Sequence, residues 1–566
     1  MLVGIDLGTT NSLIGVFNEN GPQLIPNALG EYLTPSVISV DDKGTILVGR
    51  AARDRLVTHP GSTVAAFKRW MGTARETRIG NKNYRPEELS ALVLRSLLDD
   101  AEAHLGEKIT EAVISVPAYF GDSQRKATRA AGELAGIRVE RLINEPTAAA
   151  LAYGLEQRMN GSTFIVLDLG GGTFDVSILE IFDGVMQVHA SAGDNNLGGE
   201  DFLHLMIKAC CSDLNLDSGK IKKEELAQIE SKCERAKKQL SSQHEVSLEL
   251  MVNGQVKQWT IDQDRFESIS ESLIQRIRHP IERAMRDAKL LPNQLDEVIL
   301  VGGSSRLSLM SKLVARMLGR LPLRHVDPDR AIAMGACVVA GMKARNVALE
   351  EIVMTDVCPY TLGVEIGRQD QGKQVTNGHF SPIIERNCTV PVSRSGIYQP
   401  MQEGQTKLEL NIFQGESPLV ANNVRLGRLE ISLPARSSRD DNQVEVRFTY
   451  DVNGVLQVEA TVLSTKITHE LILQENKGVL TDAEIRARLK ELSAIKVHPR
   501  EDQENVAAIA KAERIYAECL GQDRDEIQHY LIQFIGEIDR QDRQTIAKHR
   551  EQFNKTLADF EERLGW

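Results

Sequence analysis

Up to about residue 348, short apolar runs alternate with longer stretches in which apolar residues recur every three or four positions. EAVISVPAYF (111–120) and DEVILVGGSSR (296–306) belong to the first kind, and RPEELSALVLRSLLDDAEAHLG (85–106) belongs to the second. The short runs predict buried strands and the longer stretches predict amphipathic helices. Because strands and helices alternate, we expect an α/β domain with two lobes over residues 1–348.

The pattern changes beyond this domain. EEIVMTDVCP (350–359) is short and closed by a proline, so we interpret residues 349–357 as an interdomain linker rather than an element. Apolar and polar residues then alternate, as in QVEVRFTYDVNGVLQVEATV (443–462), where Asn453–Gly454 suits a tight hairpin turn. Residues 358–475 are therefore predicted to form an antiparallel β domain.

The last part of the chain has a helical period. In LTDAEIRARLKELSAI (480–495), Thr481 and Glu484 have the spacing of a capping box, and the apolar residues that follow share one helical face. The residues up to Trp566 continue this pattern. We therefore expect a helical segment over residues 476–566.

Composition narrows the class of protein. The chain of 566 residues is too long for one core, and its net charge of −12 argues against nucleic acid as a main partner. Seven cysteines without a CxxC pair predict reduced, buried thiols, with redox sensing by Cys210 and Cys211 as the alternative. Twelve histidines show no zinc-ligand spacing, so no zinc site is expected.

No segment of the chain has the pattern of a leader or a membrane span. The N-terminus is already strand-like, and AIAMGACVVAGM (331–342) is shorter than the roughly 20 apolar residues that cross a bilayer. We therefore expect a cytoplasmic protein without a membrane partner.

Two stretches repeat one motif, an apolar run that ends in an aspartate and a glycine-rich turn. They are VGIDLGTTNSLIGVF (3–17), with Asp6, and IVLDLGGGTFDVSIL (165–179), with Asp168. Each predicts a hairpin whose successive N–H groups hold an anion, since small residues let a phosphate approach the backbone. The residues suited to phosphate contact are Thr9, Thr10, Asn11, Gly170, Gly171, Gly172 and Thr173. Two facing hairpins would clamp a phosphate tail between two lobes.

The strand-end carboxylates suit Mg²⁺, which keeps several waters and binds through one or two carboxylates and phosphate oxygens. We therefore predict Mg²⁺ bound through waters near Asp6 and Asp168. The chain has no GxxxxGK[ST] and no GxGxxG after a strand, which disfavours a P-loop ATPase and a dinucleotide enzyme. A third turn, ILVGGSSR (299–306), is a candidate nucleoside contact. The alternatives are ordinary glycine hairpins and a plain strand-to-helix turn.

Nine motifs together resemble the DnaK-type heat-shock chaperones, the seventy-kilodalton family, over nearly the whole chain. They are GIDLGTTNS (4–12), AAFKRWMG (65–72), VPAYFGDSQR (116–125), RLINEPTAAALAYGL (141–155), LDLGGGTFD (167–175), LGGEDF (197–202), CERAKKQLS (233–241), LVGGSSR (300–306) and DPDRAIAMGA (327–336). The small, divergent chain is most similar to the HscC branch. The resemblance implies an α/β two-lobed actin-like ATPase domain, an antiparallel β-sandwich peptide-binding domain and a short α-helical lid.

The resemblance also assigns roles to residues of the first domain. It implies that ATP is hydrolysed to ADP and phosphate with Mg²⁺, with K⁺ as a further candidate ion. The residues matching catalytic positions are Lys68, Asp6, Asp168, Thr173, Asp175 and Glu145. Besides the phosphate loops, those matching nucleotide-binding positions are Gly198, Gly199, Glu234, Lys237, Lys238, Ser241, Gly302, Gly303, Ser304, Arg306 and Asp329. Taken without the motifs, Lys68 would be a surface lysine and Glu145 a helix-end carboxylate.

Further residues match regulatory and peptide-binding positions. Pro117, Arg125, Arg141 and Asp356 match positions through which the family senses nucleotide and engages J-domain partners. Val364, Tyr398, Met401 and Leu408 match the peptide cleft, although the alternation alone would equally fit core packing. The short hairpin SLELMVNGQVKQWTI (247–261) leaves the need for a GrpE-like exchange factor open.

The hypothesis is a monomeric, ATP-dependent stress-response chaperone that binds exposed apolar segments of unfolded proteins. Its affinity for them would be controlled by ATP binding and hydrolysis. A small-molecule kinase or a filament-forming nucleotide switch on the same actin-like scaffold is the alternative. Neither alternative uses the last two domains.

Overall fold

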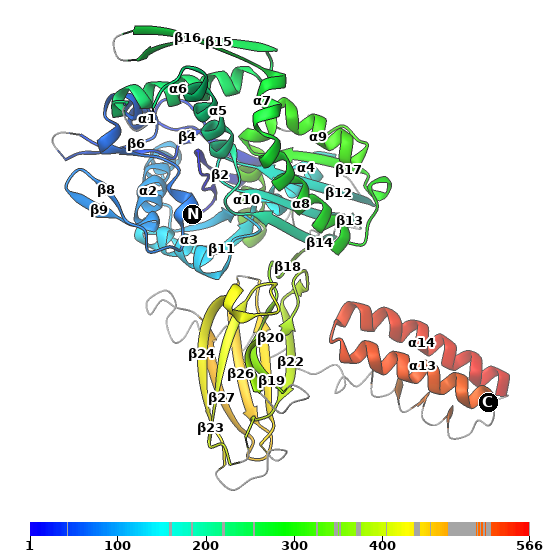
Figure 1. Ribbon diagram of the computed structural model, residues 1–566. Coiled ribbons are helices and arrows are strands. Elements are labelled where there is room, and N and C mark those ends of the chain that lie inside the picture. The colour runs from blue at the N-terminus through cyan, green and yellow to red at the C-terminus, as the bar shows by residue number, and fades with distance from the viewer. Residues whose placement is uncertain are drawn as a thin grey trace. The chain divides into compact units, whose positions relative to one another are not determined.

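The computed structural model describes residues 1–566 except 42–43, 158–160, 183–184, 218–220, 253–254, 324–326, 345–348, 350–352, 370–374, 403, 435–441, 453, 474–504, 506–507, 510, 513–514, 517–521 and 565–566. The chain divides into two compact units, Met1–Tyr360 and Thr361–Trp566. The elements of both units are labelled in Figure 1.

The first lobe of the first unit is built on a mixed sheet. Strand β1 (Leu2–Asp6) pairs antiparallel with β2 (Asn11–Asn18), which pairs antiparallel with β3 (Gly21–Ile25). On its other side β1 pairs parallel with β10 (Glu111–Val116), which pairs parallel with β11 (Arg138–Asn144). Val3 and Ile5 of β1 and the apolar residues of β10 are fully buried, as expected for strands covered on both faces.

The second lobe repeats this arrangement. Strand β12 (Ser162–Leu169) pairs antiparallel with β13 (Phe174–Phe182), which pairs antiparallel with β14 (Val185–Asp194). On its other side β12 pairs parallel with β17 (Glu297–Val301). The repeated motif therefore gives a repeated hairpin, β1–β2 in one lobe and β12–β13 in the other.

Helices complete each lobe and join the two. Helices α4 (Glu145–Gln157) and α10 (Ala331–Lys343) pack with strand residues of both sheets in one buried cluster. This burial explains why α10 is apolar around almost its whole circumference. The other helices and the hairpin β15–β16 are α1 (Arg50–Thr58), α2 (Pro86–Leu105), α3 (Asp122–Leu134), α5 (Gly199–Asp213), α6 (Lys223–Gln239), β15 (Glu245–Val252), β16 (Gln255–Asp262), α7 (Gln263–Ile269), α8 (Glu271–Asp287) and α9 (Ser308–Leu318).

The segment interpreted as a linker without an element contains a strand, so that prediction was wrong. Strand β18 (Val353–Val357) pairs parallel with β14, with Val353 opposite Val185 and Thr355 opposite Gln187. The open edge of β14 offers backbone groups that a neighbouring segment can satisfy. A short apolar run closed by a proline does not reveal such an edge, because the edge belongs to a distant part of the sequence.

The second unit contains two antiparallel sheets, as the alternation predicted. One has the order β20 (Val375–Ile384), β19 (Leu362–Gln369), β23 (Lys407–Gln414), β24 (Val424–Ser432). The other has the order β22 (Val392–Tyr398), β25 (Val444–Tyr450), β26 (Leu456–Val462), β27 (Ile467–Leu473). The sheets contact each other through β24 with β27 and β20 with β22, which makes a sandwich. Gly454 has φ 80° in the β25–β26 turn, and Asn453 lies outside the described residues.

The C-terminal part contains helices α13 (Gln522–Asp539) and α14 (Arg543–Leu564), coloured orange to red in Figure 1. Phe534 and Phe553 stack between them with ring centroids 4.6 Å apart. The predicted capping box at Thr481 and Glu484 lies outside the described residues. Within the described ranges, no helix is both long and apolar enough to span a membrane.

Candidate nucleotide site

A cavity of about 860 Å³ lies in the first unit and is lined by residues of both lobes. We call it the interlobe cavity. The predicted residues that line it are Asp6, Thr9, Thr10, Asn11, Lys68, Glu145, Asp168, Gly170, Gly171, Thr173, Gly199, Glu234, Lys237, Lys238, Ser241, Gly302, Gly303, Ser304, Arg306 and Asp329. Asp175, Gly172 and Gly198 do not line it. Gly172 and Asp175 belong to the second hairpin itself, and Gly198 packs against the Gly171 backbone.

The turns of the two hairpins touch each other. A Cβ added to Gly171 would lie 2.1 Å from Thr10 Oγ1, so the second turn lies directly against the side chain of the first. The first turn is fixed by hydroxyls, because Gly8 N donates to Ser12 Oγ (3.1 Å) and Ser36 Oγ donates to Gly8 O (2.8 Å). The repeated motif therefore builds one site rather than two.

Three buried aspartates lie at the hairpin strands. Asp6 Oδ1 accepts a hydrogen bond from Ser115 Oγ (2.7 Å), and Asp175 Oδ1 accepts one from Tyr119 N (2.9 Å). Burial, with the nearby charge of Glu145, raises the pKa of Asp6 to about 7 and of Asp175 to about 8, and raises the pKa of Asp168 well above its ordinary value. Carboxylates held this close together without a cation favour the protonated form.

The aspartates leave acceptor oxygens for a cation. Asp168 Oδ2 and Asp175 Oδ2 are buried and have no hydrogen-bond partner within the described structure. No group of three or more His, Cys, Asp or Glu side chains in the described residues could hold a metal ion directly. The donor set therefore fits Mg²⁺, which retains waters between itself and a small number of carboxylates.

Lys68 lies among these carboxylates rather than on the surface, so the surface-lysine alternative was wrong. Its side chain is 4% exposed, and its Nζ donates to Glu145 Oε1 at 2.7 Å. Lys68 belongs to a short 3-10 helix, Phe67–Trp70, of the first lobe, and Glu145 is the first residue of α4. A buried charge that has a single partner and lines a cavity can interact strongly with an anion there.

The other end of the interlobe cavity is more exposed. Arg306 is fixed by Asp329 (2.8 Å) and Asp327 (2.5 Å), and Lys237 Nζ donates to Gly199 O (2.8 Å). Lys238 is 67% exposed. Lys238 pairs with Glu234 at 3.3 Å.

Among the lining residues that sequence reasoning missed are Glu31, Tyr32, Arg50, Arg53 and Arg330. The Arg330 guanidinium lies 4.8 Å from the centroid of the Tyr32 ring, and Arg50 pairs with Glu31 at 2.5 Å. Tyr32 and Arg330 are about 300 positions apart in the sequence. No local pattern could have brought them together.

The comparisons with known proteins agree with this geometry. The family model described as "Hsp70 protein" matches residues 2–79 and 73–563. A curated relative, the chaperone protein dnaK3 of Thermosynechococcus vestitus (strain NIES-2133 / IAM M-273 / BP-1), is 38% identical over 604 residues, which cover 100% of this chain and 87% of the relative.

The chain belongs to the Hsp70 family. It is an ATP-dependent chaperone and an ATPase, and the kinase and filament alternatives are not favoured. Hsp70 proteins consist of a two-lobed ATPase part, a β-sandwich and a helical lid, in agreement with the elements described above. They bind ATP or ADP with Mg²⁺, and they act on client polypeptides with co-chaperones.

In this Hsp70 chain, a buried network of hydrogen bonds joins the residue before Glu145 to β18. Asn144, the residue before Glu145, donates to Asp356 Oδ2 (2.6 Å) and accepts from Arg125 (2.7 Å). Arg125 also donates to Ala118 O (3.1 Å), just after Pro117. Burial raises the pKa of Asp356, while the charges of Arg125 and Arg141 oppose this shift. Two of the four predicted regulatory residues, Arg125 and Asp356, therefore bond in one buried network, and the charge of Arg141 acts on Asp356.

A second series of contacts, which leads from Asp175 to Tyr360 at the end of the first unit, was not predicted. Tyr119, whose N–H bonds to Asp175, has its ring 4.4 Å from that of Tyr360, and its carbonyl accepts from Tyr360 Oη (2.7 Å). Asn195 Nδ2 donates to the same carbonyl (2.7 Å). The aromatic residue in VPAYF was a visible signal, but its partner follows the linker and could not be paired with it from the sequence.

The predicted peptide-cleft residues lie in the sandwich. Val364 on β19 is fully buried, and Leu408 on β23 is half-buried. Tyr398 Oη hydrogen-bonds with Ser381 Oγ (3.1 Å), and Met401 Sδ lies 2.3 Å from where a Cβ of Gly367 would be. Their role in binding peptide stays a prediction.

Proposed function

We propose that the phosphates of ATP bind between the two hairpins of the interlobe cavity, with the nucleoside towards Arg306 and Lys237. The proposal rests on one observation, namely that both copies of the motif and the Lys68–Glu145 pair line the same cavity. Asp6 and Asp168 would hold Mg²⁺ through waters, and the buried unpartnered oxygen of Asp168 supports this. We retain K⁺ as a proposed second cation.

The hydrolysis step needs charge neutralisation and a positioned water more than a strong base. When bound, Mg²⁺ neutralises charge on the phosphate oxygens. Lys68 would donate to the terminal phosphoryl group, and burial makes its charge more effective there. Asp175 and Thr173 would orient the attacking water, since Asp175 Oδ2 has no other partner among the described groups.

Nucleotide state would reach the peptide-binding part through Glu145, Asn144 and Asp356. This path is supported by the hydrogen bonds Lys68–Glu145 (2.7 Å) and Asn144–Asp356 (2.6 Å), which are joined because Asn144 and Glu145 are consecutive residues. A J-domain partner would act at Arg141 and Asp356. A GrpE-like exchange factor stays an open part of the proposal.

The remaining details are also proposals. The chain would comprise an ATPase domain (1–348), a linker (349–357), a β-sandwich (358–475) and a lid (476–566), and it would be a monomeric, cytoplasmic, HscC-like protein. Extended client segments would place an apolar side chain against Leu408 while the main chain bonds to the sandwich.

The experiment compares binding of a labelled apolar peptide with ATP and with ADP. We expect the wild type to bind peptide more weakly with ATP. Lys68→Ala should retain nucleotide while losing hydrolysis by about 100-fold or more, because it removes charge beside the transferring group. Leu408→Phe should weaken peptide binding but keep basal ATPase activity. Equal peptide affinity in both nucleotides would contradict the proposal.

A further inference from the structure

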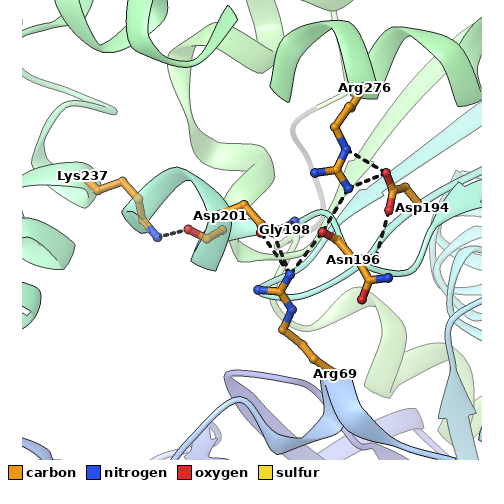
Figure 2. A network of polar contacts seen from close by, with 8 residues as sticks. Arg69, Asp194, Asn196, Gly198, Asp201, Lys237 and Arg276 are labelled. Atoms are coloured by element: carbon orange, nitrogen blue, oxygen red, sulfur yellow. Dashed lines mark hydrogen bonds and ion pairs between the residues drawn. The ribbon is translucent and has the colours of Figure 1, made fainter. Parts of the chain in front are cut away.

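Arg69, the neighbour of Lys68, makes a contact across the lobes that the proposed chemistry does not use. Its helix belongs to the first lobe, because Phe67 and Met71 on either side pack into that lobe's core. The side chain of Arg69 nevertheless reaches the second lobe, as Figure 2 shows. There Nη2 donates to Asp201 Oδ1 (3.0 Å), Asp201 Oδ2 (3.1 Å) and Asn196 O (3.1 Å).

Asp201 is well fixed in the second lobe. It lies in the first turn of α5, where its Oδ2 accepts from Gly198 N at 2.8 Å. The next residue, Phe202, is buried in the second lobe's core. Asp201 therefore cannot follow Arg69 without moving the start of α5.

The start of α5 is in turn bonded to the second phosphate hairpin. Gly199 N donates to Gly170 O and Glu200 N donates to Gly171 O, both at 2.9 Å. The stem of Arg69 packs on the same hairpin, since a Cβ at Gly172 would lie 2.6 Å from Arg69 Cγ. Any movement of Arg69 relative to α5 is thus a movement of Lys68 relative to the phosphate loop.

A second arginine supports this contact from within the second lobe. Arg276 of α8 donates to Asp194 Oδ2 (2.7 Å) and to the same Asn196 carbonyl (3.1 Å) that Arg69 reaches (Figure 2). Two positive side chains therefore converge on one carbonyl, one from each lobe. The ion pair of Arg69 with Asp201 is only 19% and 22% exposed, which limits screening by solvent.

We propose that Arg69 is a positioning residue for ATP hydrolysis, which holds Lys68 against the second phosphate hairpin by its bonds to Asp201 and Asn196. The pair also keeps the two lobes closed over bound nucleotide. The inference rests on the proposed role of Lys68. The bonds must break for the lobes to separate, so they set the rate of ADP release as well as the rate of hydrolysis.

The test measures single-turnover ATP hydrolysis and release of fluorescent ADP with the full-length chain. Arg69→Met keeps the stem on Gly172 and removes the charge, and we expect about a 10-fold slower hydrolysis and about a 10-fold faster ADP release. Asp201→Asn retains an acceptor for Gly198 N and should shift both rates in the same directions. The double variant should be no worse than Arg69→Met alone, because both changes break the same contact. Arg69→Lys should recover part of both rates.

Arg75→Met is the matched control. Arg75 lies six residues further along the same segment and stacks on Trp70 (3.5 Å to the ring centroid), a residue of the same lobe. We expect wild-type rates from it. Unchanged rates in Arg69→Met, or fully additive losses in the double variant, would overturn the inference. If Lys68→Ala hydrolyses ATP at the wild-type rate, the proposed function fails instead, and ADP release from Arg69→Met still decides whether the pair closes the lobes.

Discussion

The two hairpins arise from one motif but are supported in different ways. In the first, hydroxyl groups satisfy the polar atoms, since Asp6 is bonded to Ser115 and the Gly8 peptide to Ser12 and Ser36. In the second, Asp168 Oδ2 has no partner among the described residues, and the turn is bonded to the start of α5. The first turn is therefore fixed by hydroxyl groups within its own lobe, whereas the second is fixed to a helix and leaves a carboxylate oxygen available.

The largest expected difference concerns the two equivalent aspartates. We expect Asp168→Asn to lower kcat about 100-fold and Asp6→Asn about 10-fold, because Asp168 Oδ2 is buried without a hydrogen-bond partner among the described residues, whereas Asp6 Oδ1 is held by Ser115 Oγ. Steady-state ATPase assays at saturating ATP and Mg²⁺ check this. Equal losses would mean that the different surroundings of the two carboxylates do not matter.

For the turn glycines, in contrast, alanine should cost more stability in the first hairpin than in the second. A Cβ at Gly8 would lie 2.0 Å from the backbone oxygen of Asn11, whereas at Gly171 it would meet the Thr10 hydroxyl, which can rotate away. Gly8→Ala should lower the free energy of unfolding by about 2–3 kcal/mol and Gly171→Ala by about 1 kcal/mol. Denaturant unfolding of the two variants measures the difference, and a larger loss for Gly171→Ala would refute it.

The pH dependence of stability tests the buried acids without nucleotide or Mg²⁺. The pKa of Asp175 is about 8 and that of Asp6 about 7 in the folded chain, well above the ordinary value near 3.8. Between pH 4 and 8 the folded state therefore holds more protons than the unfolded state, so stability falls as pH rises and levels off above pH 8. Asp175→Asn should flatten this slope and add roughly 2 kcal/mol at pH 9.

Thermal unfolding across this pH range, with the same buffer composition, provides the measurement. Glu31→Gln serves as a control, because Glu31 is an exposed carboxylate paired with Arg50 and should not alter the slope. A wild-type stability that increases from pH 5 to pH 8 would contradict the raised pKa values of Asp6 and Asp175.

The smallest effect is expected at Tyr360. Tyr360→Phe keeps the ring on Tyr119 and removes one hydrogen bond to its carbonyl, so Asp175 would be held less firmly. We expect ATP hydrolysis to slow at most about 5-fold, which corresponds to about 1 kcal/mol for a neutral hydrogen bond. Single-turnover hydrolysis measures it, and Tyr360→Ala should slow the reaction further. No change in either variant would show that the tyrosine pair is only packing.

The sequence was sufficient for features encoded locally. Apolar runs predicted β1 and β12, the alternation of apolar and polar positions predicted the sandwich strands, and the glycine-rich turns predicted both hairpins. The free thiols of the described cysteines also agree, with Cys210 and Cys211 both buried. Each of these features is determined by residues that are close together in the sequence.

Features that depend on contacts between distant segments were not predictable in this way. β18 forms because β14 has an open edge, and Arg69 pairs with Asp201 because two lobes meet. Arg69 is adjacent to Lys68 in the motif AAFKRWMG, yet the motif alone does not say which lobe its side chain reaches. The family resemblance supplied candidate residues for the site, and the structure supplied their partners.

The most direct test of the account is the number of nucleotides bound per chain. Two copies of a phosphate motif that together build one cavity predict one ADP per chain in equilibrium dialysis with Mg²⁺. They also predict weaker binding in variants of either hairpin, Gly8→Ala or Asp168→Asn. Two bound nucleotides per chain, or one whose affinity depends on a single hairpin, would contradict the claim that the hairpins act as a pair.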